Sequence, residues 1–261
     1  MKNKSFAKTL VIPKSQVVST RIIALTTCFA ALYVVFSVWN LFPVIGAEGK
    51  FISAATLTAP LIGIILGPIY GVLSITLGGI AGAFLSLPTG VFGPLSFLPH
   101  ATAALTSGIL ITRKQAISAA SYFLLLVVYA FFPLSGPFWL WPPMLWFDFI
   151  GLIIVASPLQ SKAIKYLNEA SNSLHLGIGV CATCLSATLF GHVTGNILFE
   201  IFYWPNTAEW WRATWQSLTL IYPVERLTIV IVATIIGTAL VRALKSMALQ
   251  NQVWQKGEIH S

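Results

Sequence analysis

The sequence predicts an all-α, polytopic membrane protein, a single bundle of transmembrane helices. Apolar residues make up 57% of the 261 residues and charged residues only 8%, whereas soluble domains carry about 25% charged residues. The mean hydropathy is +0.84, and several apolar stretches approach the roughly 20 residues that span a bilayer. This composition excludes a cytosolic enzyme, a disordered chain and a nucleic-acid-binding domain.

Apolar segments divide the chain into candidate spans. We expect six to eight spans and count eight, at 20–41, 52–67, 69–87, 93–111, 116–133, 139–158, 175–203 and 217–242. They form one domain over 20–245, between a basic N-terminal segment, 1–19, and a C-terminal tail, 246–261. The first run could also be a signal peptide, but its apolar stretch 22–39 exceeds the usual 7–15 residues. We therefore expect an uncleaved first span.

The second and third spans come from one apolar run, 51–87, which is too long for a single helix. Gly67-Pro68 divides it, because the residue before a proline avoids the α region, and we predict a tight helical hairpin there. Small residues spaced by four let helices approach closely. We expect such packing at Gly63, Gly67, Pro68, Gly71, Gly78 and Gly82.

Charge predicts the orientation in the membrane. With the N-terminus inside and eight crossings, 12 of the 15 basic residues lie on the inner side, as the positive-inside rule requires. Only Lys50, Arg212 and Arg226 lie outside. Both termini are therefore expected in the cytoplasm. The +8 net charge is a topology signal, and we expect no nucleic-acid partner.

Polar residues gather in the outer half of the predicted bundle. In the seventh span Thr188, His192, Asn196 and Glu200 follow one another at intervals of four and share one helix face. At the same depth lie residues of three other spans, namely His100, Asp148, Glu225 and Arg226. Convergent polar groups in an apolar pocket are typical of small-ligand sites, although hydrogen bonding between helices is an alternative.

Tryptophans are concentrated at the same outer level. The stiff, proline-containing segment 138–146 holds Trp139, Trp141 and Trp146. These rings are either a lid that stacks on a flat ligand or an ordinary interfacial belt. No two histidines have the close spacing of a zinc motif, and no Gly-x-x-x-x-Gly-Lys-Ser/Thr stretch occurs. We expect no metal, no cofactor and no ATP hydrolysis by this chain itself.

The first span has a smooth face of small residues, Thr20, Ala24, Thr27 and Ala31, suited to internal packing or to docking of another membrane protein. Three stretches, Ala24 to Ser37, Gly63 to Gly71 and Ala104 to Ile111, together with the last span, resemble the substrate-binding S component of energy-coupling-factor (ECF) type vitamin transporters. The hairpin core Gly63-Ile64-Ile65-Leu66-Gly67-Pro68-Ile69-Tyr70-Gly71 is the most specific part of the resemblance, which covers about a third of the chain.

The resemblance implies a function. S components capture a vitamin or similar micronutrient on the outer face and dock on a transmembrane coupling protein that carries two ATPases. Docking uses an Ala-x-x-x-Ala motif in the first helix, which Ala24-x-x-x-Cys28 or Thr27-x-x-x-Ala31 replaces here. The family usually has six spans.

We therefore expect a non-enzymatic, solute-binding transport subunit in the plasma membrane. The predicted solute site comprises His100, Trp139, Trp141, Trp146, Asp148, His192, Asn196, Glu200, Glu225 and Arg226. Alternatives are an ion-coupled secondary transporter, a membrane enzyme that uses the histidines and carboxylates as acid–base groups, and a structural or assembly protein. No internal repeat favours the first alternative, and no paired nucleophile and base favours the second.

Overall fold

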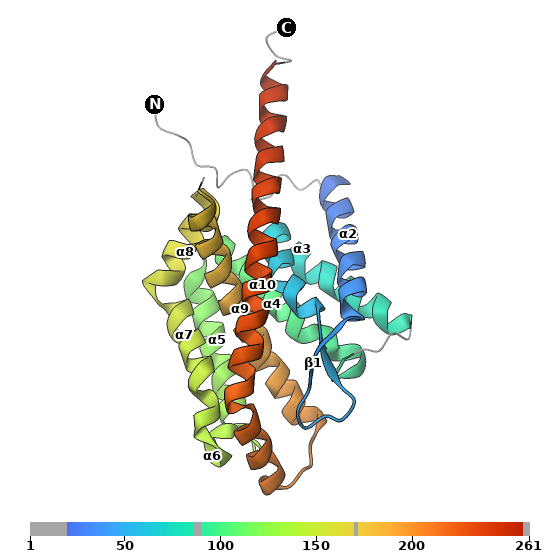
Figure 1. Cartoon of the computed structure of the whole chain (residues 1–261), viewed down its shortest axis with the longest axis vertical. Coiled ribbons are helices and arrows are strands. Elements are labelled where there is room, and N and C mark those ends of the chain that lie inside the picture. The colour runs from blue at the N-terminus through green and yellow to red at the C-terminus, as the bar shows by residue number, and fades with distance from the viewer. Residues whose placement is uncertain (1–19, 86–89, 170–171, 258–261) are drawn as a thin grey trace.

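Long apolar helices dominate the structure, a computed structural model that describes residues 20–85, 90–169 and 172–257 (Figure 1). The predicted basic segment 1–19 lies outside the described residues. In chain order the elements are α2 (Thr20–Ser37), β1 (Asn40–Pro43), β2 (Phe51–Ser53), α3 (Ala55–Phe84), η1 (Gly93–Phe97), α4 (Leu98–Ile111), α5 (Gln115–Ala130), α6 (Pro137–Leu140), η2 (Pro142–Leu145), α7 (Trp146–Ala156), α8 (Pro158–Glu169), α9 (Ser173–Phe202) and α10 (Ala208–Gly257).

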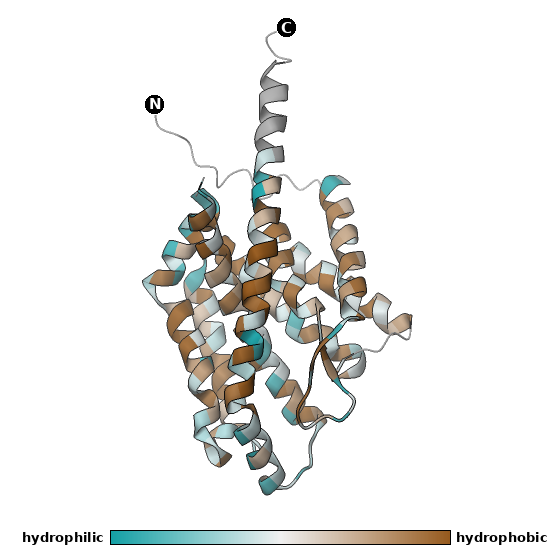
Figure 2. Ribbon diagram, in the orientation of Figure 1, coloured by the Kyte–Doolittle hydropathy of each residue, from teal (hydrophilic) through white to brown (hydrophobic). Residues whose placement is uncertain are grey.

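The predicted all-α membrane bundle is confirmed. Within the described residues, five helical segments are long and apolar enough to cross a membrane by length and composition: α2, α3 counted as one segment across its break at Gly67, η1 with α4, α9, and α10. The helix pair η2–α7 and α8, bent by 62° at the break between them, makes a sixth if it is counted as one broken span. Apolar residues cover the middle of the bundle and hydrophilic ones concentrate toward its ends (Figure 2). The protein is therefore a membrane protein with transmembrane helices.

The span count differs from the eight segments read from the sequence. The segments 52–67 and 69–87 are the two arms of α3, and α5, with 16 residues, is a shorter apolar helix. Both arms of α3 are shorter than the roughly 20 residues that cross a bilayer. At the other end of the chain, α10 begins at Ala208 and stays helical to Gly257, so the predicted boundary at 245 is not a helix end.

The predicted break at Gly67-Pro68 is confirmed. Gly67 has φ 78° and ψ −177°, a conformation outside the helix that only glycine adopts readily. The chain also reverses direction there. Gly71 and Gly63 lie in opposite arms, yet a Cβ atom added to Gly71 would be only 3.1 Å from the Cα atom of Gly63. The two arms therefore form a helical hairpin.

Helix α4 packs in direct backbone contact with its neighbours. A Cβ atom on Gly63, Gly108 or Gly191 would lie closer than 3.0 Å to backbone atoms across a contact that α4 makes with α3 or α9. Gly78 has the same role between α3 and α2, against the Ala30 carbonyl. Gly67 and Gly82 differ from Gly63, Gly71 and Gly78 of the predicted packing face, because no atom of another segment lies within 4 Å of their would-be Cβ atoms.

A two-stranded antiparallel hairpin, β1 with β2, interrupts the helical bundle after α2. The predicted spans 20–41 and 52–67 leave only 42–51 as an outer segment, so both strands overlap the ends of segments that the sequence predicted as helical. An isolated β-hairpin is only marginally stable in water. Here packing against the helices adds the stability that strand pairing alone does not provide. Its turn residue Gly46, at φ 83°, lies against the rings of Phe199 and Trp210. The hairpin is therefore fixed to the ends of α9 and α10.

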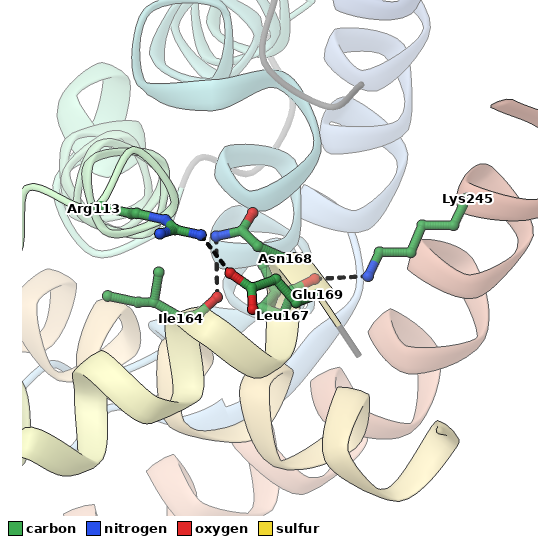
Figure 3. A network of polar contacts seen from close by, with 6 residues as sticks. All are labelled: Arg113, Ile164, Leu167, Asn168, Glu169 and Lys245. Carbon is green, nitrogen blue, oxygen red and sulfur yellow. Dashed lines mark hydrogen bonds and ion pairs between the residues drawn. The ribbon is translucent and has the colours of Figure 1, made fainter. Parts of the chain in front are cut away.

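A polar network ties the helices together at the opposite end of the bundle, where α2 begins and α8 ends (Figures 1 and 3). The Arg113 guanidinium donates to the Glu169 carboxylate at 2.7 Å, which joins the α4–α5 turn to the end of α8. The Lys245 ammonium donates to the Leu167 carbonyl at 2.8 Å. That carbonyl is in the last turn of α8, where no partner within the helix exists. Lys245 therefore caps α8 from α10.

Replacing Gly67 by alanine should destabilise the protein by about 1–3 kcal/mol, because a Cβ atom is strained in this conformation. The measurement is the melting temperature in detergent. Gly82→Ala is the matched control in the same helix, since neither glycine has an atom within 4 Å of a would-be Cβ and only Gly67 has a positive φ. Equal melting temperatures for the two variants would contradict this explanation.

Candidate functional site

A cavity of about 130 Å³ lies beneath the β1–β2 hairpin. Its walls come from α2, both arms of α3, α4, α9 and α10, and residues of the hairpin and of 90–97 complete the lining. Aromatic and small residues form most of the wall, among them Phe51, Phe92, Phe97, Gly79 and Gly195. Polar side chains from several helices also reach it, and such convergence of polar groups in a mainly apolar pocket is typical of small-molecule sites.

His100, from the first turn of α4, is fixed on one side of the cavity. Its Nδ1 atom lies 2.7 Å from the Tyr33 hydroxyl of α2, and its Nε2 atom lies 3.0 Å from the Thr56 hydroxyl of α3. The Tyr33 and His100 rings also meet edge to face, with centroids 5.6 Å apart. Both ring nitrogens are therefore occupied, and three helices set the orientation of this imidazole.

His192, Asn196 and Arg226 form a second polar group on the cavity wall. The Arg226 Nε atom donates to His192 Nδ1 at 3.1 Å, and His192 Nε2 lies 2.9 Å from the Asn196 amide. Arginine has only donors, so Nδ1 accepts, and in the neutral ring Nε2 carries the hydrogen. The Asn196 amide then offers its oxygen to Nε2, since its two ends exchange by a half turn.

Tyr222 supports this group from one turn before Arg226 in α10. Its ring meets His192 edge to face at 4.3 Å, and the Arg226 guanidinium lies 5.5 Å from the ring centroid, within range of a cation–π interaction. Thr188 lines the cavity one turn before His192. Thus four of the predicted site residues, His100, His192, Asn196 and Arg226, share the cavity, although they come from three helices.

The three predicted carboxylates do not line this cavity. Asp148 lies behind the wall, at a separate small space that it shares with His192 and Tyr222. Glu200 is fully buried, and neither of its carboxyl oxygens has a hydrogen-bond partner within the described structure. Glu225 is also buried, with its Oε2 atom unpartnered among these residues. The cavity wall therefore carries the positive charge of Arg226, and the three carboxyl groups lie outside the lining.

The predicted aromatic lid does not cover the cavity either. Trp141 and Trp146 donate their indole N–H groups to the hydroxyl and the carbonyl of Thr219 at 3.1 and 2.9 Å, so they pack η2 and α7 against α10. Trp139 is 59% exposed and meets the Phe131 ring. None of the three is among the residues that line the cavity in the described structure.

Several lining residues escaped the sequence interpretation. Tyr33 and Thr56 hold His100, Tyr222 supports His192, and the hairpin contributes Phe51 and Ile52. Only Tyr33 could have been noticed from the sequence, because it places a phenolic hydroxyl within the apolar first span. Nothing in the sequence pattern points to the others, because their roles depend on which helices are neighbours.

The small-residue face of α2 is exposed along its whole length, at Thr20, Ala24, Thr27, Cys28 and Ala31. The buried face of this helix is a different one, formed by Thr26, Ala30 and Tyr33 against α3. The five residues of the predicted docking face therefore do not serve packing within the described chain.

No family model, curated protein or solved structure matches the chain. Its function therefore has to be inferred from the cavity and from the exposed faces of the bundle.

Tyr33→Phe should lower stability by about 1–2 kcal/mol, because His100 Nδ1 would lose its hydrogen-bond partner in a partly buried site. The melting temperature in detergent measures the effect. Tyr70→Phe is the control: Tyr70 is half-buried in α3, and its hydroxyl makes no hydrogen bond within the described residues. Equal melting temperatures for the two variants would show that the Tyr33 hydrogen bond does not contribute to stability.

Proposed function

We propose that the chain is a membrane-embedded, solute-binding subunit of an uptake transporter, resembling the S components of ECF-type transporters. The cavity beneath the hairpin carries this proposal. Its imidazoles and guanidinium are fixed by other side chains before any ligand arrives. Such preorganised polar groups within an apolar and aromatic wall favour binding of a small, vitamin-like molecule.

Charge supports a cavity that opens away from the cytoplasm. Basic residues concentrate at the end of the bundle where α2 begins and α8 ends, namely Arg21, Arg113, Lys114, Lys162, Lys165, Arg242 and Lys245. The positive-inside rule assigns that end to the cytoplasm. The hairpin and the cavity beneath it lie toward the other end, where a solute would enter from outside.

An exposed docking face supports dependence on a partner. The chain has no P-loop, so energy from ATP would have to come from another protein. The exposed small residues of α2 provide a smooth surface on which a transmembrane coupling protein could approach closely. We propose that this partner carries two ATPase subunits, as in the family that the sequence resembles.

One observation favours a second candidate function, an ion-coupled carrier. Glu200 and Asp148 are buried carboxyls with unpartnered oxygens, and both lie in electrostatic range of the buried Tyr129. Intramembrane carboxyls often belong to ion or proton pathways. Uptake that persists without ATP but collapses with the proton gradient would favour this candidate over an ATP-driven subunit.

Gly195→Leu should abolish solute binding by filling the cavity. The experiment is mass spectrometry of small molecules released from the purified protein. Gly177→Leu is the matched control, because it lies in the same helix outside the cavity lining. The nearest atom to a would-be Cβ is 3.6 Å away at both glycines. We expect a compound that is enriched on the wild type and the control but lost from Gly195→Leu. No such compound, or one retained by that variant, would overturn the proposed function.

Ala24→Trp should separate binding from transport. The substitution adds bulk to the centre of the exposed α2 face, so we expect unchanged affinity for the released compound and loss of its uptake into cells. Leu32→Trp, at the edge of the exposed arc of the same helix, is the control that should keep both activities. Normal uptake by Ala24→Trp would exclude this face as the docking site.

A further inference from the structure

We propose that the solute carries an anionic group, a carboxylate or a phosphate, and that Arg226 binds it. This inference rests on the proposed function and specifies the chemistry of its ligand.

Arg226 is a buried cation without an ion pair. Its side chain is 8% exposed, and within the described part of the chain no carboxylate oxygen lies within 4.0 Å of it. Removing an ion from water is costly unless a charge or hydrogen bonds compensate. A buried cation without an acidic partner in the protein leaves room for a counter-charge that arrives with the ligand.

The guanidinium is held so that it can receive an oxyanion. His192 takes the Nε hydrogen, and the described residues offer the terminal nitrogens no hydrogen bond. The two terminal nitrogens can be reached from the cavity. Arg226 lines it, and neither nitrogen is one of the fully buried atoms without a hydrogen-bond partner. Four N–H donors thus remain for a planar carboxylate or a phosphate, which arginine binds in a forked geometry.

The lining of the cavity has one sign of charge. Arg226 is the only formally charged residue among the described residues that line it, and none of them is acidic. Asp148 and Glu225 lie in electrostatic range of Arg226 but outside the lining. Asp148 is separated from the cavity by the wall that His192 and Tyr222 form. A cationic solute would therefore meet a like charge, and a neutral one would leave the guanidinium without a direct ion-pair partner.

The test uses three ligands that share a benzene ring: benzoate, phenylphosphonate and the neutral benzamide. Each is added to the purified full-length protein at constant ionic strength, and the shift in melting temperature and the dissociation constant are measured. Four proteins are compared, the wild type, Arg226→Gln, Arg226→Lys and Arg212→Gln. Arg212 is an exposed arginine in the same helix and serves as the charge-matched control.

We expect at least one anion to stabilise the wild type and Arg212→Gln, while benzamide does not. Arg226→Gln should bind that anion roughly 10- to 100-fold more weakly, the range for one lost charged hydrogen-bonding partner. Arg226→Lys should fall between the two, because lysine keeps the charge but not the fork. This variant keeps the test decisive if Arg226→Gln is unstable. The better anion distinguishes a carboxylate from a phosphate solute.

Three results would overturn the inference: equal stabilisation by benzamide, equal binding of the anions by wild type and Arg226→Gln, or no effect of either anion. The inference can also fail separately from the proposed function. A neutral or cationic compound that is released from the wild type and lost from Gly195→Leu would refute the anion site and leave solute binding established.

Discussion

The structure depends on how closely α4 lies against α3 and α9. Glycines at these contacts, Gly63, Gly108 and Gly191, bring backbone to backbone where any Cβ atom would clash. In a bilayer, such close approach replaces the hydrophobic effect as the source of helix association. The same packing positions the site. It places His100 of α4 within hydrogen-bond distance of Tyr33 and Thr56, and it brings α4 against α9, which carries His192.

The sequence predicts the break at Gly67-Pro68 and four residues of the cavity wall for clear physical reasons. Gly67-Pro68 is a local signal that no tertiary contact can override cheaply. The polar stripe on α9 is also local, but a spacing of four exceeds the 3.6 residues of a helical turn. The face therefore rotates by about 40° at each step. Thr188, His192 and Asn196 reach the cavity, whereas Glu200, at the end of the stripe, has turned out of it.

Other features could not be read from the sequence because they depend on the arrangement of the helices. The N–H groups of Trp141 and Trp146 point to Thr219 on α10, which makes these rings part of the packing there. The β1–β2 hairpin carries only a few paired residues, a signal too weak to distinguish from a loop. Its contribution to the cavity arises because Gly46 packs against the aromatic rings of α9 and α10.

Charges within the bundle are separated by a wall of aromatic rings. Arg226 faces the cavity, and Asp148 lies at a small space behind His192 and Tyr222. Had Asp148 paired with Arg226, the guanidinium would be satisfied and the cavity wall would be effectively neutral. The His192 ring instead accepts one donor of the guanidinium without neutralising its charge. The wall thus keeps the cation available in a low-dielectric cavity, where its attraction for an anion is strongest.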